Sequence, residues 1–240
     1  MSEGTDKNNT TKPFDLFELL TAILLGLAAI GAAVAGHQNN LWGGAQSEFY
    51  SEAATLTTKA ANLYSEGVAE LNLDYSVDLL AKKEILEGLE EEGDYRSRKF
   101  EIASNLYTRY LSDEAYEELE LPKEFHGDSK EKNTKYKEQD NIDEETLIDS
   151  VESDLGESYV DDMLKEANQE FEKADKIFVS GRQANDYSDQ FSLIQVVYTI
   201  SLFFAGLALV FKTQMRWGFL GAGGLVFVFG TIMMFGVPWM

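Results

Sequence analysis

The sequence contains no cysteine, which excludes disulfide bonds, thiolate nucleophiles and thiolate metal sites. It contains only two histidines, and neither stands with carboxylates at the spacing that a zinc site needs. No carboxylate lies in an apolar context that would tune its pKa for acid or base catalysis. We therefore predict no catalytic residue, no metal and no cofactor, and a protein that is not an enzyme.

Charge is almost missing from three long apolar stretches, residues 15–36, 191–211 and 217–237. Each stretch holds about 20 residues, which at the helical rise matches the ~30 Å hydrocarbon core of a bilayer. Apart from Asp15 and Glu18 at the start of the first stretch, they hold no Asp, Glu, Lys, Arg or His, which argues against a proton pump or an ion-coupled transporter. The first stretch is too long for a signal peptide and has no basic region before it, so we expect a retained span. The fold prediction is an all-α integral membrane protein with three transmembrane helices.

Basic residues are far fewer than acidic ones in residues 43–190, which separate the first span from the second. This segment holds 38 Asp and Glu against 16 Lys and Arg, so it carries the whole net charge of −22. Such a surface repels nucleic acid and anionic lipid headgroups, which excludes both as partners of this domain. An acidic excess is typical of halophilic prokaryotic proteins and equally of Glu-rich helical stalks, and the composition leaves both interpretations open.

The loop between the second and third spans carries only positive charge, from Lys212 and Arg216. The positive-inside rule predicts that this loop and the N-terminal tail, residues 1–14, lie in the cytoplasm. The acidic domain and the C-terminal Met240 are then extracytoplasmic. Trp42, Trp217 and Trp239 stand at span ends, where their rings anchor a helix at the headgroup level beside membrane lipids.

Apolar or small residues recur at alternating spacings of three and four on both sides of the acidic segment. After the first span they are Phe49, Ala53, Leu56, Ala60 and Leu63, and before the second span they are Leu164, Ala167, Phe171, Ala174 and Phe178. This spacing predicts two coiled-coil helices that form an extramembrane stalk. Whether these helices pair within one chain or between chains stays open, as does the number of chains.

A helical hairpin is predicted between the two stalk helices. Its first helix, 75–89, has a stripe of Leu79, Leu80, Lys83, Leu86 and Leu89, and its second, 95–111, has a stripe of Phe100, Ala103, Leu106, Tyr107 and Tyr110. Gly93 marks the break between them. Residues 122–145, which include His126, are polar and predict a flexible linker. Helix is expected to resume near Asp143, with Leu147, Val151 and Leu155 at i+4 spacing.

Five polar residues near or in the spans are candidates for a pore or for the membrane interface: His37, Gln38, Asn39, Gln195 and Thr199. The first three follow the first span, where they could line a pore mouth or simply occupy the headgroup layer. The other two lie in the second span, where they could face a pore or bond a neighbouring helix.

The order of parts resembles a family of prokaryotic membrane proteins of uncharacterised function, a domain of unknown function. The matching residues are the stretch TAILLGLAAIGAAVAG from Thr21 to Gly36, the polar exit Gln38-Asn39-Asn40, and the hairpin from Ser201 to Gly230. The resemblance implies one N-terminal span, a charged helical middle and a C-terminal two-span hairpin. It implies no activity.

Two functions follow from these features. The first is a structural or interaction protein, a homo-oligomer whose acidic stalk meets another protein of the cell envelope. The second is an oligomeric cation channel with an acidic vestibule.

Overall fold

The computed structural model describes residues 15–122, 141–211 and 213–240, and every regular element within them is an α-helix. In chain order the helices are α1 (Leu16–Glu90), α2 (Asp94–Tyr110), α3 (Asp113–Glu118), α4 (Glu144–Asp149), α5 (Glu157–Val210) and α6 (Met215–Gly236). Three of them, α1, α5 and α6, are long and apolar enough to cross a membrane. The prediction of an all-α protein with three candidate spans is thus confirmed.

The chain divides into two compact units. The membrane unit comprises the described residues of 15–52 and 176–240, and the acidic unit comprises those of 53–175. Both α1 and α5 are divided between the two units, so that each helix has one part in the membrane unit and one in the acidic unit.

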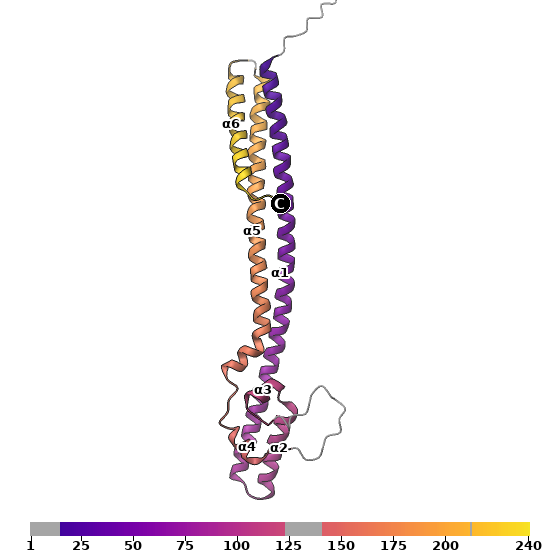
Figure 1. The fold of residues 1–240 in the computed structure, drawn as a ribbon, viewed down its shortest axis with the longest axis vertical. Coiled ribbons are helices and arrows are strands. Elements are labelled where there is room, and N and C mark those ends of the chain that lie inside the picture. Colours follow the sequence, from indigo (N-terminus) through magenta and orange to yellow (C-terminus); the bar gives the residue numbers. More distant parts are fainter. Residues whose placement is uncertain (1–14, 123–140, 212) are drawn as a thin grey trace, which may run out of the picture. The chain divides into compact units, whose positions relative to one another are not determined.

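The membrane unit is a bundle of three helices. Figure 1 shows α6, in yellow, beside the C-terminal part of α5. Its core is small, with Ala28, Ala35, Phe191, Ile194 and Tyr198 all buried. Large apolar side chains point outward instead, and Leu225 and Phe235 are 76% and 78% exposed. An apolar exterior of this kind is suited to lipid chains rather than to water.

Glycine brings the three membrane helices close together. A Cβ atom added at Gly31 of α1 would lie 2.7 Å from the ring of Tyr198 on α5. One added at Gly223 of α6 would lie 3.2 Å from the carbonyl oxygen of Ser201. Such close approach is the usual way in which helices gain packing energy in a bilayer, where the hydrophobic effect between helices is absent.

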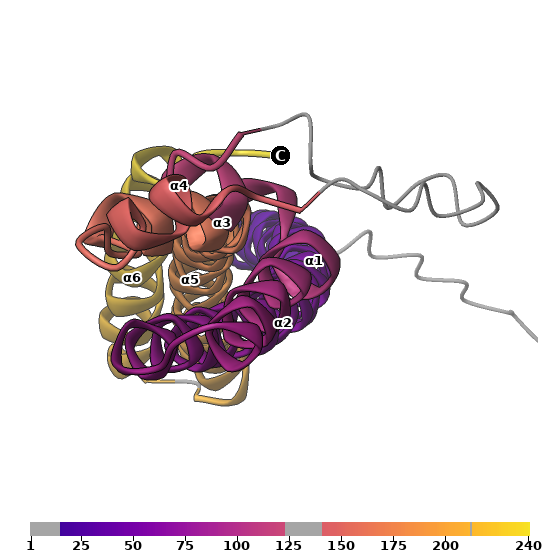
Figure 2. The same cartoon turned by 90° about the horizontal axis from the view of Figure 1, so that it is seen from below.

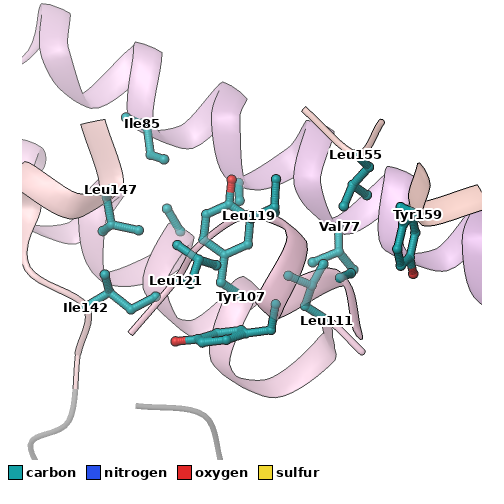
Figure 3. Close-up of a cluster of buried hydrophobic side chains, with 14 of the residues drawn as sticks. Val77, Ile85, Tyr107, Leu111, Leu119, Leu121, Ile142, Leu147, Leu155 and Tyr159 are labelled. Carbon is teal, nitrogen blue, oxygen red and sulfur yellow. The ribbon is translucent and has the colours of Figure 1, made fainter. Parts of the chain in front are cut away.

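The acidic unit has a core of its own, which is built where α2, α3 and α4 gather around α1 (Figure 2). Figure 3 shows side chains from α1, α2, α4 and α5 and from the connecting segments in one cluster. The buried residues that it labels are Val77, Ile85, Tyr107, Leu111, Leu119, Leu121, Ile142, Leu147, Leu155 and Tyr159.

Within the acidic unit α1 and α5 pair inside one chain. A Cβ atom added at Gly67 would lie 3.1 Å from the Leu164 side chain, and the Lys59 Nζ lies 3.0 Å from a carboxylate oxygen of Glu170. The buried positions on both helices are mostly small residues seven apart, namely Ala53, Ala60 and Gly67 on α1 and Ala167 and Ala174 on α5. The question of pairing that the sequence left open is thus answered for this contact.

The predicted α5 seam is partly wrong. Ala167 and Ala174 are buried as expected, but Phe171 and Phe178 are 37% and 45% exposed. Because alanines set the distance between the helices, little room is left for a phenylalanine ring at the seam. Phe178 lies instead against the ring of Tyr50, with centroids 5.2 Å apart.

The leucine stripe predicted to face the hairpin partner is also wrong. Leu79 and Leu86 are 70% and 51% exposed, whereas Val77, Ala81 and Ile85 are buried. The buried stripe packs on Phe100, Ala103 and Tyr107 of α2, which belong to the stripe predicted for that helix. Tyr110, also predicted for it, is 58% exposed. Small residues again explain the choice, since a Cβ atom added at Gly88 would lie only 3.0 Å from the Lys99 Cβ atom of α2.

The break between α1 and α2 lies where the sequence predicted it. Gly93 has a φ of 63° and a ψ of −137°, and Asp94 begins α2. A positive φ is readily adopted by glycine because it has no Cβ atom.

The segment predicted as a linker, 122–145, is described only at its ends, since residues 123–140, with His126, lie outside the described residues. Ile142 is buried, and the Asp143 side chain caps α4 by accepting a hydrogen bond from the Thr146 N–H. The helix that begins here does not continue to Leu155 as expected. It ends at Asp149, and an irregular segment carries Leu155 into the core before α5 begins. The short helix α3 was not predicted.

Candidate functional site

Gln38 and Trp42, on α1, meet the C-terminal residues at one end of the membrane unit. The Gln38 Nε2 donates to the Met240 carbonyl oxygen at 3.3 Å, and the Met240 N–H donates to the Gln38 Oε1 at 3.0 Å. The indole N–H of Trp42 donates to the Pro238 carbonyl oxygen at 3.1 Å. These bonds join residues about 200 positions apart, and they hold the segment after α6 against α1.

Asn39 lies at the same end but bonds to α5. The Ser188 hydroxyl donates to the Asn39 Oδ1 at 2.6 Å. Beside this pair, the rings of Trp42 and Tyr187 have centroids 4.8 Å apart. The Asn39 side chain therefore bonds within the chain, whereas His37 is exposed.

The two candidates of the second span, Gln195 and Thr199, lie one turn apart on an exposed face of α5. The Thr199 hydroxyl donates to the Gln195 carbonyl oxygen at 2.9 Å, which is a bond within its own helix. The Gln195 amide group lies over Gly36, 3.2 Å from where a Cβ atom there would stand. None of the five candidate residues lines either of the cavities described below.

Tyr198 and Ser201 are buried polar residues that link two membrane helices. The Tyr198 hydroxyl lies 3.1 Å from the Thr231 Oγ1, and the Ser201 hydroxyl donates to the Gly223 carbonyl oxygen at 2.8 Å. Both bonds join α5 to α6. Interhelical bonds of this kind stabilise a bundle in lipid by about 1 kcal/mol each.

The opposite end of the membrane unit holds the second group of predicted anchors. The Arg216 guanidinium lies 3.6 Å from a carboxylate oxygen of Asp15 and 4.4 Å from the centroid of the Phe17 ring. The Trp217 ring meets the Phe17 ring edge-on, with centroids 5.0 Å apart. Lys212 lies outside the described residues. The starts of α1 and α6 thus lie at the same end, as a chain with three spans requires.

Trp239, the third predicted anchor, lies at the end that holds Gln38. Its indole N–H donates to the Met234 carbonyl oxygen at 3.1 Å, and its ring lies 6.4 Å from those of Phe191 and Phe235. Its role as an anchor at the headgroup level stays a prediction.

A buried carboxylate in the acidic unit escaped the sequence analysis. Asp74 is fully buried, and its two oxygens accept hydrogen bonds from the Ser112 N–H at 2.9 Å, from the Ser112 hydroxyl at 2.8 Å and from the Tyr159 hydroxyl. These donors come from the start of α3 and from the first turn of α5. Asp74 thereby ties both segments to α1.

Asp78 makes a second buried site one turn further along α1. It accepts a hydrogen bond from the Tyr107 hydroxyl at 2.9 Å and pairs with the Lys82 Nζ at 2.9 Å. Lys82 also donates to the Ser153 carbonyl oxygen. The burial of both carboxylates could have been inferred from their spacing, because Asp74 and Asp78 lie on the same side of α1 as Val77, Ala81 and Ile85.

The tyrosine partners of both carboxylates stay protonated. Burial raises the pKa of the Tyr107 hydroxyl, and the neighbouring Asp78 raises it further. Burial also raises the pKa of Tyr159, and its hydrogen bond to Asp74 acts in the same direction. Both hydroxyls therefore donate permanently, and the two carboxylates are structural acceptors.

The acidic unit contains an acidic cleft of about 580 Å³. It is lined by Tyr159, Met163 and six carboxylates, those of Glu70, Glu114, Glu117, Glu118, Asp162 and Glu166. Partial burial raises the pKa of Glu70, and the negative charges of Glu114, Asp74 and Asp113 raise it further. Within the described ranges, no group of three or more His, Cys, Asp or Glu residues could hold a metal ion.

Another cavity, of about 260 Å³, lies on the exposed side of α1. It is lined by Leu79, Lys82, Lys83, Leu86, Glu87 and Glu90. Two of the four leucines that were expected in the hairpin core, Leu79 and Leu86, therefore line a surface groove flanked by charges of both signs.

Comparisons with protein-family models, with curated proteins and with solved structures gave no match for this chain. The resemblance drawn from the sequence is supported at the level of architecture, as a helical chain with one apolar helical segment before a helical middle and two after it.

Proposed function

We propose that this chain is a non-enzymatic membrane scaffold, a homo-oligomer that presents an acidic helical unit to another protein of the cell envelope. The observation that supports it most directly is the use of polar groups in the membrane unit. Gln38, Asn39, Tyr198 and Ser201 all bond within the chain. These groups hold helices together and leave little polar surface for a transport path.

The acidic unit supports the same proposal. Asp74 and Asp78, its buried carboxylates, are occupied by hydrogen-bond donors and so are poorly placed for acid or base catalysis. Its surface is acidic and carries exposed apolar side chains, which suits recognition of protein rather than of nucleic acid.

A cation channel is the second candidate. Gln195 and Thr199 lie on an exposed face of α5, so a ring of several chains could bring these faces together around a pore. The acidic unit would then concentrate cations near its mouth.

The mass of the complex in lipid nanodiscs, together with conductance in planar bilayers, separates the two candidates. For the scaffold we expect more than one chain per complex and no conductance above that of empty bilayers. A closed ring of four or more chains that conducts cations would favour the channel. A single chain per nanodisc would contradict both.

We also propose that the acidic unit is extracytoplasmic and that the loop before α6 is cytoplasmic. Arg216 and Lys212 support this orientation through the positive-inside rule. Because the chain has no cysteine, single cysteines at exposed positions report it directly. A membrane-impermeant maleimide is expected to label Glu66→Cys on intact cells but not Thr213→Cys. The reverse pattern would overturn the orientation.

A further inference from the structure

A polar side chain faces outward from the membrane unit within the second candidate span. Gln195 is exposed on α5, and its depth follows from the aromatic residues near one end of the unit. Tyr187, whose ring contacts that of Trp42, lies eight residues before Gln195, which is about 12 Å at the helical rise. With these rings at the headgroup level, where tryptophan and tyrosine prefer to lie, the Gln195 side chain is in the hydrocarbon.

The Gln195 carboxamide carries two N–H donors and one carbonyl acceptor. The Thr199 hydroxyl bonds to the backbone carbonyl oxygen of Gln195 and not to its side chain. Within the part of the chain that the structure describes, the carboxamide has no hydrogen-bond partner. Lipid chains offer neither donor nor acceptor, so a polar group that faces them without a partner costs free energy. A covering surface that carries both a donor and an acceptor is therefore favoured.

Small and polar residues surround Gln195 on this side of the membrane unit. The residues that form this surface, called the amide face below, are Ala29, Ala33 and Gly36 on α1 and Ser192, Gln195 and Thr199 on α5. Spacings of three and four residues put each set on one side of its helix. The two sets lie side by side, because the Gln195 amide lies over Gly36. Small residues of this kind let a further helix approach closely in a bilayer.

We infer that two copies of this chain meet in the membrane at the amide face, with their Gln195 carboxamides hydrogen-bonded to each other. Copies inserted in the same orientation are related by a two-fold axis along the membrane normal, so each residue of the face meets its own equivalent at the same depth. A carboxamide is self-complementary, since it donates to the carbonyl oxygen of a second carboxamide and accepts from its N–H. The inference rests on the proposed homo-oligomer and names the contact that forms it.

Hydrogen bonding selects a second copy over the other occupants of this face. A different membrane protein would need a donor and an acceptor at the same depth, which a second copy supplies by symmetry. Residues 29–36 and 192–199 contain no charged side chain, so the two-fold contact opposes no like charges there. Glu18 lies on the same side of α1, but about 27 Å from Gly36 at the helical rise, where the helix begins and water reaches it.

Cysteine cross-linking of the full-length protein in membranes tests the geometry, since an introduced cysteine is the only thiol. Thr199→Cys places a thiol on the amide face, one turn from Gln195. Val228→Cys places one on the exposed side of α6 at a similar depth, because Gly230 of α6 contacts Val197 of α5. Oxidation with copper phenanthroline is expected to give a disulfide-linked dimer for Thr199→Cys and none for Val228→Cys. Equal cross-linking of both variants, or none of Thr199→Cys, contradicts the two-fold contact.

Gln195→Leu tests the amide pair itself. Leucine suits both the helix and the lipid, so the chain is expected to stay helical, which circular dichroism checks. The dissociation constant of the dimer, measured by energy transfer between labelled copies in liposomes, is expected to rise at least about tenfold. Gln195→Asn keeps a carboxamide and should raise it less. Gln190→Leu makes the same change at an exposed position before the span and is expected to leave the constant unchanged.

The outcomes separate this inference from the proposed function. If unmodified protein is oligomeric and Gln195→Leu associates as tightly as Gln190→Leu, the amide face is not the contact although the proposed homo-oligomer stands. If unmodified protein is a single chain at every ratio of protein to lipid, both proposals fail. A ring of four or more chains in which Thr199→Cys reacts with a water-soluble thiol reagent would show water at this face, which contradicts the amide pair and favours the channel.

Discussion

Asp74→Ala is expected to lower the free energy of unfolding of the acidic unit by about 3 kcal/mol. The substitution removes the acceptor of three hydrogen bonds. It leaves the Ser112 N–H without the acceptor described for it, and it leaves the Tyr159 hydroxyl with only the 3.3 Å contact to the Ser112 hydroxyl. Buried donors that lose an acceptor cost more than the bond itself contributed. Hydrogen exchange of full-length protein under increasing denaturant measures this free energy separately for peptides of the acidic unit.

Two further variants show whether burial causes the loss. Glu66→Ala removes a carboxylate from an exposed position on the same helix and is expected to change the free energy by less than about 0.5 kcal/mol. Asp74→Asn keeps one acceptor oxygen at the same place, so its loss should fall between the two. Equal effects of Asp74→Ala and Glu66→Ala would show that the buried network contributes nothing measurable.

The three membrane helices could be predicted because a continuous run of apolar residues is visible in the sequence itself. About 20 apolar residues in a row are sufficient to cross a bilayer, whatever the rest of the chain does. The break at Gly93 was readable for a similar reason, since a positive φ is a local property of the residue.

The buried face of α1 in the acidic unit could not be predicted in the same way. Its helix carries two candidate stripes, one of leucines through Leu79 and Leu86 and one of smaller residues through Ala81 and Gly88. Hydrophobicity favoured the first, but the close approach of α2 requires the second. The hydrophobic pattern of one helix does not indicate how closely a neighbouring helix packs against it.

The partners of buried polar side chains could not be predicted from the sequence either. Gln38 was singled out as polar, yet its partner, Met240, lies about 200 residues away. Asp74 was overlooked because a carboxylate is usually solvated, and only its register with Val77 and Ala81 pointed inward. Partners distant in sequence are set by the fold, so residue type alone could not assign these side chains to packing.

Gly31→Ile is expected to lower the free energy of unfolding of the membrane unit by about 2–3 kcal/mol. The new Cβ atom would lie 2.7 Å from the ring of Tyr198, which is too close for any relaxed contact. Tyr198 has little freedom to move, because it is almost fully buried and its hydroxyl lies 3.1 Å from the Thr231 hydroxyl. Tryptophan fluorescence during denaturant unfolding in detergent micelles measures the loss, since Trp42 contacts Tyr187 in the same unit.

Gly26→Ile is the matched control, because it makes the same change in the same span. A Cβ atom added at Gly26 would have no atom of a neighbouring helix within 4 Å. It is expected to leave the unfolding transition in place, since its side chain enters open space on the helix surface. Combining Gly31→Ile with Tyr198→Leu removes the obstructing ring and should lose less than the sum of the two single changes. If Gly26→Ile and Gly31→Ile shift the transition alike, β-branching within the helix is the cause and the close contact between α1 and α5 is not.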